Sequence, residues 1–403
     1  MSAKSRLIAD IESLLAAANS SDVDDLDYAT RVAMLGKVES IQHQLDDPVL
    51  AMYRHLSNVR AYNLSYNLNG IQINLVIQAN QTAALRTCVN CGYLVRVALI
   101  DNLGRLMRQL SSTGILRSLG ENEYAHTKFS LAYIDRSEVD FFNLVMDEIA
   151  PVAYRLPEYI AAHEPDAILD AYQSPFSWAN EREGKNFYEV LLEQPDRLAK
   201  FNSGMMTQEA QNRILGLFPF TNFAENIDKN GPLRPFIVDV AGGRGQSLVA
   251  IKGELDGVDT QNLGRWILQE RQGVLDSIPD DELPGIEKMA IDFFEPQPLK
   301  GAHIYYLRRI LHNWHDEPAK LILKNIADAM LPDSILLIGE MVFPEQAGVN
   351  KYIYMMDICM LIIGGKERTG NDFSRLLDAV GLRLVKVSVS DAGDQAVIEC
   401  RLK

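Results

Sequence analysis

The chain has 403 residues, and its 39 Lys and Arg against 54 Asp and Glu give a formal net charge of −15 at pH 7. Hydrophobic residues make up 47% and charged residues 23%, which is ordinary globular composition and excludes a disordered or fibrous chain. Nucleic-acid binders hold phosphates with clustered Lys and Arg, so the acidic balance argues against that class. The length suggests two or three domains.

The first third of the sequence predicts helices. Apolar residues share one helical face over Leu7–Leu15 and again over Met34–Leu45, and each stripe needs another domain or a second subunit to cover it. A further helical pattern runs over Ala83–Arg117, followed by short segments at 115–119 and 124–129. Helices followed by a small hairpin predict a winged-helix-like module. The acidic total favours a protein-facing role for this module over DNA reading.

Cysteine use and hydropathy indicate a cytoplasmic protein. Four cysteines cannot form a disulfide framework. Cys88 and Cys91 form a C-x-x-C pair in an apolar stretch, and without a second pair we expect buried structural thiols and no metal site. Charged residues interrupt the first apolar run, so no signal peptide is expected. The longest charge-free stretch, Ala61–Leu85, holds eight Asn or Gln, which argues against a membrane span.

Strands and helices alternate in the last part of the chain. Short apolar runs predict strands at Phe236–Val240, Trp266–Gln269, Met289–Ile291, His303–Leu307 and Ser334–Met341. Helical stretches lie between several of these runs, most clearly over Pro318–Met330. Such alternation predicts an α/β fold with a doubly wound, Rossmann-like sheet. Two β-rich runs at 382–388 and 396–400 predict an antiparallel hairpin at the edge of this sheet.

A glycine loop follows the first of these strands. The segment Val238–Gln246 reads V-D-V-A-G-G-R-G-Q, and glycines at a strand-to-helix junction let a ligand approach the backbone. The dinucleotide fingerprint G-x-G-x-x-G fails, because Leu248 stands at the third glycine position. A shorter glycine loop preceded by an acid favours S-adenosylmethionine, whose amino-acid end offers an ammonium and a carboxylate. A plain tight turn is the alternative.

Acids follow the next two strands. Glu270 ends the second strand, where a carboxylate can accept both ribose hydroxyls of a nucleoside. Asp292 and Phe293 follow the third strand and offer an acceptor and a stacking ring for adenine. Taken singly, each residue is also explained as a helix cap or a core aromatic. Their order at successive strand ends supports a cofactor site.

One histidine and two glutamates form a candidate catalytic set. His312 follows an apolar strand directly, at the carboxyl edge where ligands bind in such sheets. Glu340 ends the next strand, and Glu367 lies in a polar loop after the apolar stretch Tyr354–Ile363. A histidine flanked by carboxylates is a general base whose orientation and protonation its neighbours set. A structural imidazole is the alternative for any single histidine.

Four motifs together carry a family resemblance. The segments V-D-V-A-G-G-R-G, L-R-R-I-L-H-N-W-x-D-E, G-E-M-V-F-P and G-G-K-E-R-T resemble the plant- and fungal-type S-adenosylmethionine-dependent O-methyltransferases, the caffeic acid and flavonoid group, with the fungal secondary-metabolite branch closest. The resemblance implies a mainly helical, winged-helix-like dimerisation domain over 1–165 and a methyltransferase domain over 166–403. It also implies a homodimer that acts on a small aromatic or polyketide-type substrate.

The resemblance assigns roles to residues of this chain. It implies that His312 deprotonates a phenolic or enolic hydroxyl while Glu340 and Glu367 hold its ring. The implied cofactor residues are Asp239, Gly243, Gly245, Glu270, Asp292, Phe293 and Arg308. The implied substrate residues are Phe201, Met205, Met356 and Ile362, although a stripe of Met and aromatic residues is as often core.

Several residues depart from the family pattern. Ala241 replaces a loop glycine, Arg271 replaces an apolar residue, Asn313 follows the base in place of Asp, and Glu209 replaces a serine. Some fungal relatives of this kind bind the cofactor yet catalyse dehydration or pericyclic cyclisation, and this is our alternative function. There Asn313 would contact the substrate, and His126 would reach the pocket from the N-terminal domain, unless it is a surface or dimer-contact residue. A third, non-enzymatic reading is a cofactor-binding regulator, which would have no use for the base.

Overall fold

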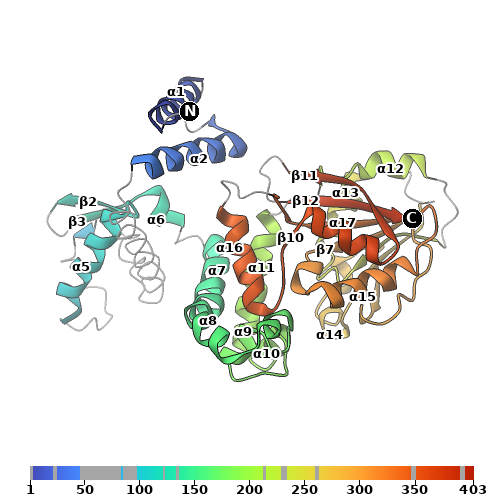
Figure 1. Cartoon of the computed structure of the whole chain (residues 1–403). Coiled ribbons are helices and arrows are strands. Elements are labelled where there is room, and N and C mark those ends of the chain that lie inside the picture. Colours follow the sequence, from blue (N-terminus) through green and yellow to red (C-terminus); the bar gives the residue numbers. More distant parts are fainter. Residues whose placement is uncertain are drawn as a thin grey trace. The chain divides into compact units, whose positions relative to one another are not determined.

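A computed structural model gives the arrangement of the chain (Figure 1). It describes residues 3–20, 25–45, 83–84, 98–120, 123–132, 136–211, 215–227, 234–258, 263–345, 351–390 and 395–403. The chain divides into two compact units, one made of Met1–Ser21, Lys37–Pro151 and Gln194–Gln211 and the other of Asp22–Gly36, Val152–Glu193 and Asn212–Lys403. The predicted thiols Cys88 and Cys91 lie outside the described residues.

The first unit is mainly helical. Its helices are α1 (Ala3–Ser20), the second half of α2 (Tyr28–Leu45), α5 (Ala98–Ser112), α6 (Lys128–Ala132), α7 (Arg136–Leu144), the π-helical turn η3 (Val145–Ile149) and α11 (Pro195–Gln211). Its strands are β1 (Ala83–Ala84), β2 (Leu116–Gly120) and β3 (Glu123–His126), in the antiparallel order β1-β3-β2. The first apolar stripe is exposed in part, because Ile8, Ile11 and Leu15 of α1 are 45%, 46% and 59% exposed.

The helix that the sequence predicts over Ala83–Arg117 is wrong at both ends. Its first two residues form β1, and its last residues belong to a turn and to β2. The hydroxyls of Ser112 and Thr113 donate to carbonyl oxygens of the last turn of α5, and Gly114 adopts a left-handed φ of 79°. Short hydroxyl side chains compete with helix propagation, and glycine ends helices in this conformation, so α5 stops at Ser112.

Helix α11 is fastened to α7 and η3 within this unit. The Arg197 Nε donates to Glu148 Oε1 at 2.9 Å, and Glu148 is buried. A Cβ on Gly204 would lie 3.2 Å from the Asp140 carbonyl oxygen, so the two helices approach closely at that glycine. This packing holds the segment of α11 that carries Phe201 and Met205.

The second unit carries a seven-stranded sheet. Its strands are β4 (Pro235–Val240), β5 (Arg265–Glu270), β6 (Glu287–Ala290), β7 (Ile304–Arg308), β8 (Ile335–Glu340), β11 (Leu382–Val389) and β12 (Ala396–Leu402). Their order is β11-β12-β8-β7-β4-β5-β6, with parallel pairing from β8 to β6 and antiparallel pairing of β12 with β8 and β11. A mostly parallel sheet of this kind confirms the predicted α/β, Rossmann-like class.

Helices cover both faces of this sheet (Figure 1). The helices and helical turns of the second unit are α8 (Ala150–Ala162), η4 (Pro165–Leu169), α9 (Pro175–Ala179), α10 (Phe187–Leu192), α12 (Phe220–Asn226), α13 (Gln246–Glu254), α14 (Gln272–Leu275), η5 (Asp280–Glu282), η6 (Leu311–Asn313), α15 (Asp316–Ala327), α16 (Lys351–Ile363) and α17 (Gly370–Ala379). A short parallel pair joins β9 (Val342–Phe343) to β10 (Arg368–Thr369).

The core explains why these runs form strands. Successive residues of β7 face opposite sides of the sheet, so Tyr306 packs in one cluster with Leu248 of α13, while Leu307 packs in the other with Ile322 of α15. All four side chains are at most 1% exposed. Full burial of such side chains contributes about 1.5–3 kcal/mol each relative to exposure. Two covered faces require near-continuous apolar strands, which is the pattern that the sequence contains.

The helix predicted over Pro318–Met330 is observed as α15 with slightly different bounds, Asp316–Ala327. Helix α15 begins at Asp316, ahead of the predicted Pro318, because acidic residues favour the first turn of a helix.

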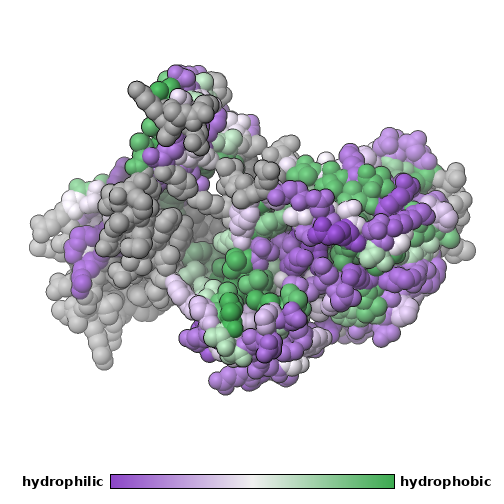
Figure 2. Space-filling model, viewed as in Figure 1, coloured by the Kyte–Doolittle hydropathy of each residue, from purple (hydrophilic) through white to green (hydrophobic). Residues whose placement is uncertain are grey.

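Among the described helices, none combines the length and the apolar character needed to cross a bilayer. In Figure 2 polar residues dominate much of the visible surface of the second unit, and apolar residues gather over α16, where Met355 and Ile358 are exposed.

Candidate active site

The glycine loop turns tightly between β4 and α13. Ala241, Gly243 and Gly245 have φ values of 58°, 59° and 82°, in the left-handed region that favours glycine. Gly242 is required for a different reason, since a Cβ there would lie 2.3 Å from Asp239 Oδ2. The Asp239 side chain is buried at the end of β4, packed directly against this glycine. Ala241 is the departure from the family glycine, and backbone strain of this kind clusters at functional sites.

Glu270 binds the glycine loop from the neighbouring strand. Its Oε2 accepts the N–H of Gly243 at 3.0 Å, and its Oε1 accepts the N–H of Arg271 at 2.8 Å. Burial raises the pKa of Glu270, and the two backbone hydrogen bonds and the Arg271 charge oppose that rise. The Arg271 side chain itself is exposed. The predicted ribose acid therefore lies against the predicted cofactor loop.

Asp292 and Phe293 lie beside the end of β5. The N–H of Ile291 donates to the Glu270 carbonyl oxygen at 3.0 Å, which brings this segment next to Glu270. Asp292 is exposed, and its Oδ1 accepts the N–H of Phe294 at 3.0 Å. Phe293 is half-buried and packs edge-on against Phe294, with ring centroids 4.8 Å apart. Asp292 thus shapes a turn in addition to any contact with adenine.

These residues fit the cofactor that the sequence predicts. A buried acid at the end of β4, a loop that admits no Cβ at Gly242, and Glu270 on the next strand stand at adjacent carboxyl ends of parallel strands. In open α/β sheets, ligands bind outside the carboxyl ends of the strands. Carboxylates there suit the ammonium and the ribose hydroxyls of S-adenosylmethionine, and backbone N–H groups of the loop suit its carboxylate.

His312 lies between two buried carboxylates. It belongs to η6, just after β7, and its Nδ1 is 2.9 Å from Glu367 Oε1 and 3.6 Å from Glu340 Oε2. His312, Glu340 and Glu367 are 5%, 1% and 6% exposed. Glu340 Oε1 also accepts the N–H groups of Ile310 and Leu311, at 3.0 and 2.9 Å. Glu340 therefore fixes the loop that carries the base as well as facing its ring.

Burial and the neighbouring charges shift the pKa values of His312 and Glu340. Burial by itself lowers the pKa of His312, but the charges of Glu340 and Glu367 and the hydrogen bond to Glu367 outweigh it, so the pKa is raised. Burial, with the charge of Glu367, raises the pKa of Glu340 against the effect of His312. A histidine held this way keeps its Nδ1 toward the acids, so Nε2 is the ring nitrogen that they do not engage.

Glu367 is positioned by the segment that follows α16. Its N–H donates to Asp357 Oδ1 of α16 at 3.2 Å. The N–H of Lys366 donates to the His312 carbonyl oxygen at 2.7 Å. A Cβ on Gly365 would lie 2.3 Å from that same oxygen, so the two loops approach to backbone contact there. Asp357 carries no sequence signal of its own and was missed by sequence reasoning.

Other predicted residues of the second unit lie near this set. Asn313 donates from Nδ2 to the Arg309 carbonyl oxygen at 3.2 Å, so its amide braces the base loop. Arg308 ends β7 and is half-buried. Met356 and Ile362 are 2% and 0% exposed on α16, which packs against η6.

Three predicted residues belong to the first unit. Phe201 and Met205 are half-buried on α11. His126 ends β3, its Nδ1 lies 2.9 Å from Ser130 Oγ, and burial lowers its pKa. The serine hydroxyl also accepts the N–H of Thr127 at 2.9 Å, so His126 takes part in the turn before α6. Contacts of these three residues with the acceptor stay predictions.

Two further polar residues lie close to the base and were missed. Burial raises the pKa of Tyr188, on α10, to about 12; the Arg309 charge opposes the rise, and the Glu270 and Glu340 charges add to it. Tyr188 is therefore within electrostatic range of both Glu270 and Glu340. Arg309 has a left-handed φ of 56°, and its charge lowers the pKa of His312. No motif in the sequence singles out Tyr188, whereas Arg309 stands inside the base motif.

The catalytic set also has the composition of a metal site. The ligand atoms of His312, Glu340 and Glu367 lie within 4.8 Å of one another. The 2.9 Å separation of His312 Nδ1 and Glu367 Oε1 is that of an N–H···O hydrogen bond, and Glu340 Oε1 is engaged by backbone N–H groups. These contacts orient the imidazole, while Glu340 Oε2 and Glu367 Oε2 are buried without a hydrogen-bond partner among the described residues.

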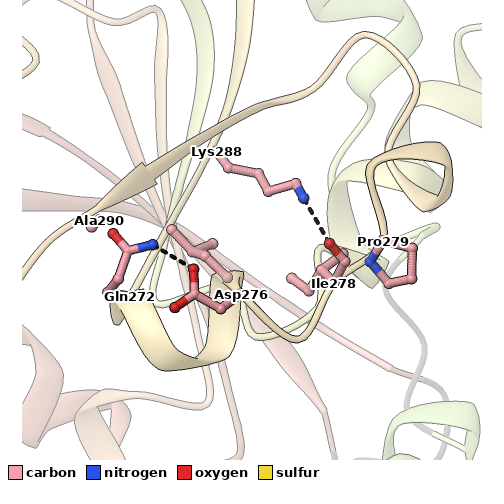
Figure 3. A pocket seen from close by; sticks show the side chains of 7 residues that line it. Gln272, Asp276, Ile278, Pro279, Lys288 and Ala290 are labelled. Atoms are coloured by element: carbon pink, nitrogen blue, oxygen red, sulfur yellow. Dashed lines mark hydrogen bonds between the residues drawn. The ribbon is translucent and has the colours of Figure 1, made fainter.

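A separate surface pocket lies beside β6 and α14 (Figure 3). Its polar groups pair with one another, since Lys288 Nζ donates to the Ile278 carbonyl oxygen and Gln272 Nε2 donates to Asp276 Oδ1, both at 2.7 Å. None of the predicted site residues lines it. It is therefore not part of the candidate active site.

Comparison with known proteins gives a family. A model of the O-methyltransferase domain matches residues 165–383. The O-methyltransferase hmp5 of Hypomyces subiculosus is 37% identical over 98% of this chain and 97% of its own length. The crystal structure of OxaC with SAH and oxaline matches with a TM-score of 0.81 and 26% identity over 100% of both chains. A protein described as a pericyclic reaction enzyme matches with a TM-score of 0.80 over 98% of this chain and 99% of its own, and at 23% identity it shows the fold alone. The chain belongs to the S-adenosylmethionine-dependent O-methyltransferase family, together with fungal enzymes of secondary metabolism.

Proposed function

We propose that this enzyme methylates a phenolic or enolic hydroxyl of a secondary metabolite, with His312 as general base. The observation that carries the proposal is the hydrogen bond of 2.9 Å between His312 Nδ1 and the buried Glu367. His312 lies on the loop after β7, and the proposed cofactor acids Asp239 and Glu270 lie at the ends of β4 and β5 in the same parallel sheet. Family membership supplies the reaction class.

The base works through its second ring nitrogen. With Nδ1–H donated to Glu367, the neutral imidazole presents Nε2 to the acceptor hydroxyl and takes its proton. Glu340 and Glu367 then stabilise the imidazolium that forms. S-adenosylmethionine, when bound, supplies a methyl group on a positively charged sulfur. The deprotonated acceptor oxygen is the nucleophile for that methyl group, and the proton leaves His312 to solvent after product release.

The cofactor is held by the glycine loop and the strand ends around it. Asp239, Gly243 and Gly245 would hold the amino-acid end, and Glu270 the ribose. Asp292 and Phe293 would contact adenine, and Arg308 would lie where the family often has Lys. The loop geometry supports this set, because Gly243 and Gly245 adopt left-handed φ values of 59° and 82° and a Cβ on Gly242 would collide with Asp239.

Apolar residues would recognise the acceptor. In the second unit these are Met356 and Ile362 of α16, and the family resemblance alone adds Phe201 and Met205 of α11 as candidates. The burial of Met356 and Ile362 on a helix that packs against η6 supports their part in this. Asn313, which braces the base loop, would act on the acceptor through that loop.

We further propose that residues 1–165 form a winged-helix-like dimerisation domain and 166–403 the catalytic domain of a cytoplasmic homodimer. The exposed apolar residues of α1 support a second subunit as their cover. The three-stranded sheet β1-β3-β2 after α5 supports the winged-helix-like interpretation.

A second candidate function is a pericyclic or dehydrative cyclisation that keeps the cofactor methyl in place. Polar groups beyond His312 favour it, because the Arg309 charge acts on His312 and on Tyr188, and the Glu340 charge acts on Tyr188. A cation and a phenol there can polarise a substrate carbonyl without any methyl transfer. His126, on β3 of the first unit, is a candidate polar group for this function from the sequence alone.

Product mass distinguishes the two functions. The enzyme is incubated with S-adenosylmethionine that carries a CD3 group and with a panel of phenols, enolic pyridones and their alcohol precursors. O-methylation predicts one CD3 group on oxygen in the product. A product isomeric with its substrate, or one that has lost water, and free of deuterium, would contradict methyl transfer and support cyclisation.

A further inference from the structure

Arg368 is the largest fully buried side chain among the described residues. It is 1% exposed and directly follows Glu367 in the motif G-G-K-E-R-T. A buried guanidinium must have all its charge and hydrogen-bonding capacity met by the protein, because desolvation of an unpaired ion costs several kcal/mol. Its partners are therefore a guide to what it does.

Those partners lie on both sides of the base. Arg368 Nη1 donates to the carbonyl oxygen of Leu311 at 2.9 Å, and Nη2 donates to the carbonyl oxygen of Trp314 at 2.7 Å. These carbonyls precede and follow His312 in the chain. Nε and Nη2 also donate to Asp316 Oδ1, the first residue of α15, at 3.1 and 2.9 Å. The Arg368 side chain thus holds the segment from η6 to α15 through two backbone carbonyls and one carboxylate.

The backbone around Arg368 reinforces the same contact. Lys366 N–H donates to the His312 carbonyl oxygen at 2.7 Å, and Glu367 meets the imidazole itself. Three consecutive residues therefore hold His312. Lys366 binds its backbone carbonyl, Glu367 binds its ring, and Arg368 binds the carbonyls on either side of it. Only a planar fork with several fixed N–H directions can serve two carbonyls and a carboxylate at once, which a lysine ammonium cannot reproduce.

We propose that Arg368 is a positioning residue that sets the distance between His312 and Glu367 by fixing the base loop. The proposal rests on the proposed role of His312 as the base. The guanidinium bonds to backbone carbonyls and to Asp316, so Arg368 acts through the segment of residues 311–316. Loosening that loop lets the imidazole move from the carboxylates, which lowers the pKa of His312 and misplaces Nε2.

The variant Arg368→Lys tests this without removing the buried charge. We expect kcat to fall about 10- to 100-fold, because displacing a catalytic group by about 1 Å has effects of that size. The affinity for S-adenosylhomocysteine stays within about twofold, since the loop and acids that hold the cofactor lie on β4 and β5. The acid limb of kcat/KM moves to lower pH, and so does the titration of the His312 ring measured by NMR with 13C-labelled histidine.

The matched control is Arg375→Lys. Arg375 Nη2 forms an ion pair with Asp372 at 2.5 Å, but its side chain is 73% exposed, on α17. We expect kcat, the acid limb and the melting temperature of this variant to match the wild type. Because Lys keeps the positive charge at both positions, a shift seen with Arg368→Lys alone reports geometry.

Two results with the Arg368→Lys variant would overturn the proposal. A folded Arg368→Lys variant with the kcat and the acid limb of the wild type contradicts it. A variant whose kcat and melting temperature fall while the His312 titration stays in place also contradicts it, because that result means a structural role only. If this variant does not fold, Asp316→Asn is used, since its side chain is 49% exposed and the carbonyl contacts of Arg368 remain. A smaller shift of the His312 titration in the same direction supports the proposal, and no shift contradicts it. Wild-type turnover by His312→Ala would instead overturn the base assignment itself.

Discussion

The chemistry at the residue scale depends on the proton on His312. Its pKa is raised because two buried carboxylates attract the charged form more than burial disfavours it. A general base must be neutral to accept a proton, so activity falls as the pH drops below that pKa. Glu367 supplies both a charge and a hydrogen bond to this balance, and is the residue through which the pH dependence can be changed.

Replacing Glu367 with Gln should therefore shift the pH profile. The pKa of His312 falls, so the acid limb of kcat/KM moves to lower pH, while kcat drops because the imidazolium loses a stabilising charge. Glu317→Gln is the control, since that carboxylate is 84% exposed on α15. An acid limb at the wild-type position in Glu367→Gln, measured by initial rates across pH, would contradict the assignment of this limb to His312.

Sequence reasoning predicted that His312 and its two acids lie together, for a physical reason. His312 and Glu340 directly follow or end apolar strands, and parallel strands bring their carboxyl ends to one edge. Glu367 was found through the family motif. Arg368, Asp357 and Tyr188 were missed as functional residues because their roles come from contacts between distant segments, such as the bond from Arg368 to Leu311, 57 residues away.

At the scale of elements, the glycine loop sets how closely a ligand can approach β4. Gly242→Ala places a Cβ against Asp239 Oδ2 and within 2.7 Å of Leu268 Cδ1. Overpacking of this kind destabilises by about 1–3 kcal/mol. We expect a lower free energy of unfolding in urea and a loss of S-adenosylhomocysteine binding by calorimetry.

A second glycine gives the matched control. Gly253 lies in α13, and a Cβ there meets nothing within 4 Å. Gly253→Ala should raise the free energy of unfolding by up to about 1 kcal/mol, because alanine favours helix, and should leave cofactor binding unchanged. Equal effects of the two substitutions would show that the loop has no special need for glycine at position 242.

The elements themselves were predictable where burial is two-sided. Strands β4, β5, β7 and β8 begin and end within one or two residues of the apolar runs in the sequence, because both faces of the sheet are covered. The helical pattern over Ala83–Arg117 is correct for α5 and wrong at Ala83–Ala84, since apolar spacing cannot register the pairing of β1 with β3. A tertiary contact overrode the local pattern there.

At the scale of the whole molecule, the net charge of −15 and the exposed apolar residues of α1 have different consequences. The charge favours solvation and disfavours nucleic acid, while apolar patches favour association. We expect sedimentation equilibrium to give twice the monomer mass of 45.1 kDa. Charged substitutions at Ile11 and Leu15 should weaken that dimer; a monomer at micromolar concentration in the wild type would contradict it.

The proposed boundary near residue 165 and the two observed compact units differ in where they place one helix. The helix α11, at Pro195–Gln211, packs with α7 in the first unit although it follows residues of the second. A boundary near 165 follows from composition and resemblance, whereas the return of a later helix is set by contacts such as Arg197 with Glu148. Long-range packing of this kind leaves no periodic signal in the sequence.

Methyl transfer by His312→Ala tests the central claim most directly. The variant is compared with wild type and with His315→Ala, a half-buried histidine of the same loop, on an acceptor that the wild type methylates. We predict that transfer falls about 10²-fold or more, as expected for loss of a general base, while S-adenosylhomocysteine binds with unchanged affinity and His315→Ala retains wild-type rates. Transfer by His312→Ala within a few-fold of wild type would contradict the assignment of His312 as the base.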